Sequence, residues 1–291
     1  MRALDVIVVM FLLTQVLSLG VGTLLIENQK ANPSFAALNV APDEPSSVMN
    51  AFYFLISILV GAGMLLIILM FPFRDKVILF IEFLSTTVAC FIVFFVLLST
   101  MGIANTDVVS VLMAVAMFAV RLYFTPFRNV LAVVASAGIG AVIGFSIDPL
   151  PLIVFAILVA IYDLLAVKWT GHMVQFAKHF MKQKTSFSVG FEGTRRKRVM
   201  EKGKAVMREE PWMIELGSGD MAIASAITVV SYKLGGFLFP LAAMAGSAVG
   251  LYLVMARAAK EKEVMPAMPM IVSFSLIFVA VAVVIASLLQ F

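Results

Sequence analysis

Residues 215–230 read ELGSGDMAIASAITVV and place one carboxylate, Asp220, at the start of a run with almost no other polar character. The residues after Asp220 suit lipid or a packed helical interior. An ionised carboxylate inside a membrane costs at least ~2.5 kcal/mol, and such residues usually mark functional sites. The role of Asp220 therefore has to be inferred from the apolar runs that surround it in the sequence.

The composition of the chain predicts a membrane protein. Of its 291 residues, 62% are hydrophobic and 13% are charged, whereas an ordinary globular domain carries about 25% charged residues. A membrane helix needs about 20 mainly apolar residues. Nine such runs lie at 4–26, 51–72, 77–99, 107–124, 129–146, 150–168, 213–232, 236–256 and 267–290. We therefore expect an all-α membrane protein with nine transmembrane helices.

Lysine and arginine fall mostly on one side of these spans. If the amino terminus is cytoplasmic, 19 of the 21 basic residues are cytoplasmic and only Lys30 and Lys233 are external. The positive-inside rule then predicts a cytoplasmic amino terminus and an external carboxyl terminus. Because topology explains the basic excess, no nucleic-acid partner is expected.

The spans divide the chain into four parts. Residues 1–146 hold spans one to five as a scaffold, 150–168 form the sixth span, and 213–291 hold spans seven to nine. Residues 169–212 read as a basic cytoplasmic loop, which we expect to be partly disordered. The chain has one cysteine and two histidines, so neither a metal nor another cofactor is expected, and His172 and His179 are given no metal role.

Two buried carboxylates have no simple structural explanation. Asp163 lies in PLIVFAILVAIYDLLAV (151–167), five residues before Lys168, which places it about 8 Å from that end of the span. Asp220 is roughly seven residues into the next span, or about 10 Å deep. Because the loop between them is cytoplasmic, the two spans are antiparallel and both carboxylates lie at the same depth.

Two adjacent carboxylates can act together as acid and base. In a low-dielectric site they cannot both ionise, so the pair shares a proton. One aspartate can then deprotonate a water that attacks a peptide carbonyl, while its protonated partner donates to the carbonyl oxygen. The alternative is a proton- or cation-coupled transporter or channel, in which buried aspartates carry ions. The shared depth and the lack of a visible internal repeat favour the protease. A third interpretation, a scaffold that binds membrane helices without cutting them, leaves the carboxylate pair unexplained.

Two further features accompany the aspartates. Gly217 and Gly219 lack a β-carbon, so a neighbouring helix or a substrate backbone can approach Asp220 closely. The segment EVMPAMPMIV (263–272) carries two prolines three residues apart, beginning with Pro266, and these interrupt the helix start. Irregular backbone at that depth can line a cavity. Simple helix packing and ordinary helix initiation remain as alternatives for these two features.

The motifs together resemble the intramembrane aspartyl proteases of the presenilin and signal peptide peptidase family. The resemblance rests on Tyr162-Asp163, on Gly217-Ser218-Gly219-Asp220, on Pro266-Ala267-Met268 and on the nine spans. It implies that Asp163 and Asp220 are the catalytic dyad, supported by Tyr162, Gly217 and Gly219. Pro266, Ala267 and Met268 would replace the family's Pro-Ala-Leu motif, which supports the active site and engages substrate. Methionine for leucine nearly conserves volume.

The resemblance also implies the partners of the protein. Substrates would be proteins with a membrane-spanning helix, or remnant signal peptides, held in the lipid bilayer. The predicted orientation resembles that of presenilin, and an archaeal homologue would be a multi-pass protein of the cell membrane. A homo-oligomer and a need for partner subunits are left open.

Overall fold

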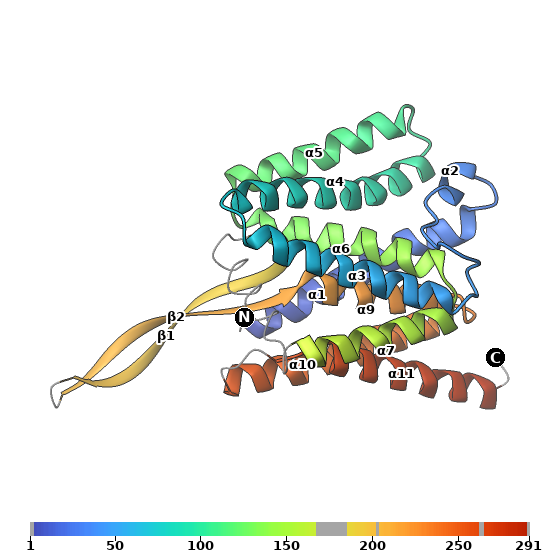
Figure 1. Ribbon diagram of the computed structural model, residues 1–291. Coiled ribbons are helices and arrows are strands. Elements are labelled where there is room, and N and C mark those ends of the chain that lie inside the picture. Colours follow the sequence, from blue (N-terminus) through green and yellow to red (C-terminus); the bar gives the residue numbers. More distant parts are fainter. Residues whose placement is uncertain (1–2, 167–184, 202–203, 262–264, 290–291) are drawn as a thin grey trace.

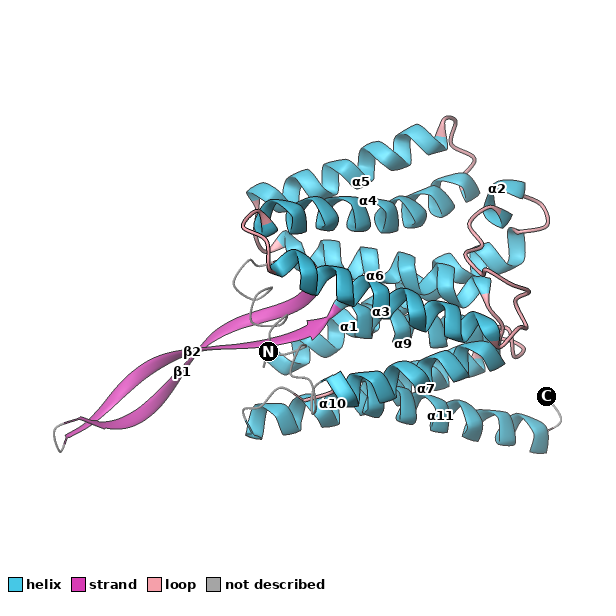
Figure 2. Ribbon diagram, in the orientation of Figure 1, coloured by secondary structure: helices cyan, strands magenta, loops and turns pink. Residues whose placement is uncertain are grey.

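The computed structural model describes residues 3–166, 185–201, 204–261 and 265–289, and these are mostly helical (Figure 1). The helices are α1 (Ala3–Asn28), α2 (Pro33–Ala36), α3 (Met49–Leu69), α4 (Arg74–Thr100), α5 (Thr106–Tyr123), α6 (Phe127–Ser146), α7 (Pro149–Leu165), α9 (Ser218–Tyr232), α10 (Leu238–Glu261) and α11 (Met268–Leu288). Two strands, β1 (Ser188–Glu201) and β2 (Lys204–Gly217), precede α9 (Figure 2).

Seven of these helices are long and apolar enough to cross a membrane, namely α1, α3, α4, α5, α6, α10 and α11. The helices α7 and α9, with 17 and 15 residues, are shorter. They nevertheless lie at the predicted sixth and seventh spans. The chain is therefore an integral, multi-pass membrane protein, and the count of nine crossings stays a prediction.

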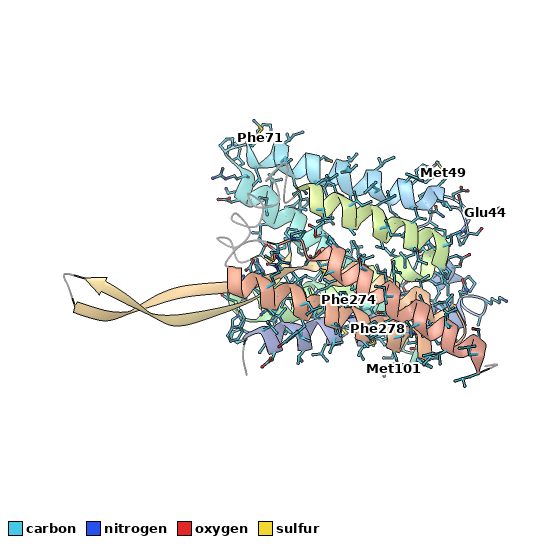
Figure 3. All side chains as sticks on the ribbon, turned by 90° about the horizontal axis from the view of Figure 1, so that it is seen from below. Glu44, Met49, Phe71, Met101, Phe274 and Phe278 are labelled. Atoms are coloured by element: carbon cyan, nitrogen blue, oxygen red, sulfur yellow. The ribbon has the colours of Figure 1, made fainter. Side chains whose placement is uncertain are left out.

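Large apolar side chains cover the outside of the helical bundle. Figure 3 shows them along the outer helices, with Met49 of α3 and Phe278 of α11 among those labelled, and these two residues are 49% and 36% exposed. Soluble proteins rarely expose apolar surface of such extent. The outer surface therefore suits contact with lipid.

The central element is α9, which packs against α1, α6, α7, α10 and α11. All residues from Met221 to Ser231 are buried. Two glycines of α6 allow its close approach: a β-carbon at Gly140 would lie 2.5 Å from the Ser225 β-carbon, and one at Gly144 would lie 2.7 Å from the Ala226 carbonyl oxygen. Small residues at such contacts let membrane helices pack tightly, and this packing fixes the position of α9.

The segment before α9 includes part of residues 169–212, for which a basic and partly disordered loop was predicted. Here β1 and β2 pair in antiparallel fashion, with Ser188 opposite Gly217. The resulting hairpin extends away from the helices (Figure 1). Residues 167–184 lie outside the described part of the chain.

The predicted start of the seventh span at residue 213 is also wrong, because β2 continues to Gly217 and α9 begins at Ser218. The residues WMIEL (212–216) are mostly apolar, and a short apolar run does not distinguish a strand from a buried helix. The strand forms because it pairs with β1, a partner that hydropathy does not reveal.

Candidate active site

Asp163 lies near the end of α7, on the face that is buried in the bundle. Phe155, Ala156 and Val159 are buried on the same face, because residues three and four apart align along a helix. Asp163 itself is 8% exposed. Its Oδ2 accepts the backbone N–H of Met268 at 3.1 Å. The carboxyl group is therefore fixed against the beginning of α11.

Asp220 is the third residue of α9 and lies in its first turn. The N-cap of this helix is Gly217, whose backbone is extended with φ −63° and ψ 139°, and its backbone N–H donates to the Asp220 carboxyl group. A carboxylate in the first turn is also favoured by the helix dipole. The strand-to-helix junction therefore holds Asp220, which is half-buried, at one end of the bundle.

The three helices that carry the predicted motifs pack together. Val159 of α7, Ile223 of α9 and Met268 of α11 belong to one buried apolar cluster. As a result, the carboxyl groups of Asp163 and Asp220 are near enough to interact electrostatically. The structure thus brings together the two carboxylates that the sequence placed at one depth.

The segment before α11 reaches Asp163 through its backbone. Residues 265–267 are irregular and α11 begins at Met268. The first N–H groups of a helix have no partner within it, and Asp163 accepts hydrogen bonds from the backbone N–H groups of Met268 and Ala267. The Met268 side chain is 2% exposed and packs in the apolar cluster, while Pro266 is half-buried. The contact with Asp163 is made by the backbone of residue 268 and does not depend on its side chain.

The remaining predicted residues lie beside the two carboxylates. Tyr162 precedes Asp163 and is half-buried. A β-carbon at Gly217 would lie 3.4 Å from Asp220 Oδ2, which is ordinary contact, and one at Gly219 would meet no atom within 4 Å. No neighbouring helix in the described part of the chain packs on Gly219. The space beside it leaves room for a substrate backbone.

Sequence reasoning missed a set of polar contacts that hold the base of the hairpin beside the site. The Asn129 side chain on α6 bonds Gly190 in both directions, donating to its carbonyl at 3.0 Å and accepting its N–H at 3.2 Å. Glu215 accepts from the Ser188 hydroxyl at 3.1 Å and pairs with Arg128 Nη2 at 3.4 Å. The only signal of these contacts in the sequence was the adjacent polar pair Arg128 and Asn129 at the start of an apolar span.

Within the described residues, no group of three or more His, Cys, Asp or Glu is arranged to hold a metal ion. His172 and His179 lie outside this part of the chain. The chemistry available at the site is therefore that of the two carboxyl groups and the backbone N–H groups around them.

Comparisons with known proteins show the family and the fold of the chain. The family model described as signal-peptide peptidase, presenilin aspartyl protease matches residues 8–288, and no curated protein matches the chain. Two solved structures of a presenilin family intramembrane aspartate protease are similar. The one in space group C222 has a TM-score of 0.66 and 22% identity, covering 97% of this chain and 99% of that chain. The one in P2 has a TM-score of 0.64 and 24% identity, covering 96% of each. The structures show a shared fold, and the family match spans nearly the whole chain, so this protein belongs to the signal-peptide peptidase and presenilin family and is an intramembrane aspartyl protease.

Proposed function

We propose that Asp163 and Asp220 are the catalytic dyad with which this protein hydrolyses peptide bonds of membrane-spanning helices. The observation that carries the proposal is that the two carboxyl groups lie near enough to interact electrostatically, with Asp163 held by the Met268 N–H at 3.1 Å. A fixed carboxylate needs little reorganisation during reaction, which favours catalysis. The family match does not favour the transporter or channel interpretation.

The chemistry follows from one proton shared between two carboxyl groups. The ionised carboxylate removes a proton from water as the water oxygen bonds to the peptide carbonyl carbon. The protonated partner gives its proton to the carbonyl oxygen, which forms a neutral tetrahedral diol. Transfer of a proton to the amide nitrogen then allows the C–N bond to break, and the products are a carboxylic acid and an amine.

The substrate must present an unwound peptide bond to this site. A membrane helix hides its carbonyl groups in hydrogen bonds to residues four positions away. We infer that the open space beside Gly219 receives the substrate backbone and that the irregular chain from Pro266 to Met268 engages it, as an added strand would. Suitable substrates are proteins with a single span and remnant signal peptides, particularly those with helix-weakening residues near the cleaved bond.

The site also suggests how the protein lies in the membrane. We infer nine crossings, formed by the seven long helices together with α7 and α9, with the amino terminus cytoplasmic and the carboxyl terminus external. Both aspartates then lie near the cytoplasmic face of a cell membrane. In this arrangement residues 1–146 are the scaffold, and the segments 150–168 and 213–291 carry the reacting and substrate-binding groups.

The test is cleavage of a single-span substrate by purified protein in liposomes. Asp163→Asn and Asp220→Asn should each lower the cleavage rate by ~100-fold or more, because an amide cannot replace a catalytic carboxylic acid. The matched control is Asp107→Asn, at the exposed start of α5, which should cleave at the parental rate. Thermal unfolding of all variants checks that the fold is intact.

Parental cleavage by both folded dyad variants would refute the assignment of these two aspartates. The unwinding step has a separate test, in which glycine pairs are introduced into the substrate helix near the cleaved bond. These should raise the cleavage rate, because glycine weakens helices by about 1 kcal/mol per residue. A rate that is insensitive to them would count against unwinding.

A further inference from the structure

A fully buried carboxylate lies outside the proposed dyad. Glu82 on α4 has no exposed surface, and Arg121 on α5 pairs with it, with Nη2 2.8 Å from Oε1 and 3.0 Å from Oε2. The Arg121 guanidinium also lies 5.7 Å from the centre of the Phe118 ring. Two apolar side chains would join these helices at lower desolvation cost. The ion pair therefore needs a reason beyond helix packing.

A third contact supplies that reason. Glu82 Oε1 also accepts the backbone N–H of Ser186 at 2.7 Å. Ser186 belongs to the short segment Thr185–Phe187 that leads into β1, and its side chain is 1% exposed. An apolar pair could not bind this N–H, and a buried N–H without an acceptor is costly. Glu82 therefore joins α4 and α5 to the chain that precedes the hairpin.

The segment Thr185–Phe187 in turn contacts the start of α9. The carbonyl of Phe187 accepts the N–H of Ser218 at 2.9 Å, and Ser136 on α6 donates to the carbonyl of Ser218 at 3.0 Å. Ser218 is the first residue of α9, two positions before Asp220. A continuous set of contacts thus runs from Glu82 through Ser186 and Phe187 to the residue that begins the helix of Asp220.

We propose that Glu82 and Arg121 are positioning residues for Asp220: the ion pair fixes the Glu82 carboxylate, which docks the segment Thr185–Phe187 and so sets the position of the first turn of α9. The inference rests on the proposed function of the dyad. It assigns Glu82 and Arg121 no contact with substrate. They affect the position of Asp220 relative to Asp163. Reaction rates are sensitive to displacements of about 1 Å.

Two double variants separate docking from helix pairing. Glu82→Gln with Arg121→Met removes both charges but keeps a carbonyl that can accept the Ser186 N–H. Glu82→Leu with Arg121→Met removes the charges and the acceptor together. Neither leaves an unpaired buried charge. The matched control is Asp75→Asn, which breaks the exposed contact of 3.8 Å with Arg74 on the same helix and should behave as the parent.

The measurements are kcat and KM for a single-span substrate in liposomes, and amide hydrogen exchange of residues 185–190 and 217–221. The leucine variant should lose between ~10-fold and ~100-fold in kcat, with KM within about twofold of the parent, and both segments should exchange faster. The glutamine variant should rescue kcat and exchange protection toward parental values. Thermal unfolding should show that both double variants are folded, with the leucine variant the less stable, because the buried Ser186 N–H then lacks its acceptor.

Equal kcat and equal exchange in the two double variants would overturn the inference, since the carboxylate would then serve only to pair α4 with α5. Faster exchange without a loss of kcat would overturn it as well, because docking would not position Asp220. The dyad variants identify a failure of the proposed function separately. The exchange comparison needs no cleavage, so equal protection would refute docking even if the parent were inactive.

Discussion

Replacing Gly250 by alanine should disturb the proposed site through the packing of α10 on α11. A β-carbon at this position would lie 2.5 Å from the Met270 carbonyl oxygen and 3.0 Å from the Ile271 α-carbon. These are backbone atoms, so no side-chain rotation relieves the clash. The first turn of α11 must move away from α10.

The size of this movement follows from the contact distances. Ordinary van der Waals contact begins at 3.4 Å, against the 2.5 Å found here, so the turn must shift by about 0.9 Å. Met268 lies in the same turn and donates to Asp163 at 3.1 Å. A shift of that size along the bond exceeds the reach of a hydrogen bond. We expect a loss of about 1–3 kcal/mol in unfolding free energy from overpacking and a loss of ~100-fold in kcat from the displaced carboxylate.

The assay combines thermal or denaturant unfolding in detergent with cleavage of a single-span substrate. Gly63→Ala is the matched control, because a β-carbon there would meet no atom within 4 Å, and alanine should be neutral or stabilise α3 by up to ~1 kcal/mol. Parental kcat in a destabilised Gly250→Ala protein would refute a role for the Met268 contact. Unchanged stability would refute the packing argument itself.

Further predictions concern contacts away from the site. Gln15→Leu removes the amide oxygen that accepts the Thr228 hydroxyl at 2.8 Å and the Ser247 hydroxyl at 3.0 Å, and it should lower the unfolding free energy by about 0.6–1.7 kcal/mol; an equally stable variant in denaturant unfolding would contradict this. The Ser47 hydroxyl is the largest cause that holds the pKa of Asp43 below its ordinary value of 3.8. Ser47→Ala should therefore raise the pKa of Asp43, and an unchanged carboxyl titration in NMR spectra would argue against the bond. Lys233→Met removes an ammonium group that caps carbonyls at the end of α6 at 2.8 Å, and it should lower the melting temperature; a rise would show that the desolvation cost of the buried amine outweighs the cap.

Hydropathy was sufficient to place the helices. Each predicted span coincides with a helix to within about five residues, and the largest differences are the start of the seventh, predicted at 213 but found at Ser218, and the end of the eighth, predicted at 256 but found at Glu261. The count that put Asp220 about 10 Å deep started at residue 213, and it does not hold, because Asp220 is only the third residue of α9. The spans themselves were placed without knowledge of which helices are neighbours.

The hairpin was not predictable in the same way. Its strands pair residue by residue from Ser188 and Gly217 to the tip, but their sequence is rich in charge and reads as a solvated loop. The contact of Glu82 with Ser186 spans 104 positions. Hydropathy places Glu82 in an apolar span but does not reveal its partners, which the structure shows to be Arg121 and the Ser186 N–H.

The sequence by itself therefore determined the membrane class of the protein, its helical segments and the candidate pair of carboxylates. Lipid offers no hydrogen bonds, so each apolar run must satisfy its own backbone as a helix wherever it lies. Only the tertiary structure decided that the N–H of Met268 binds Asp163, that α9 begins directly after a paired strand, and that Glu82 reaches Ser186. Such contacts depend on which helix faces pack together, and the close approach at residues such as Gly140 and Gly250 sets that packing over the whole bundle.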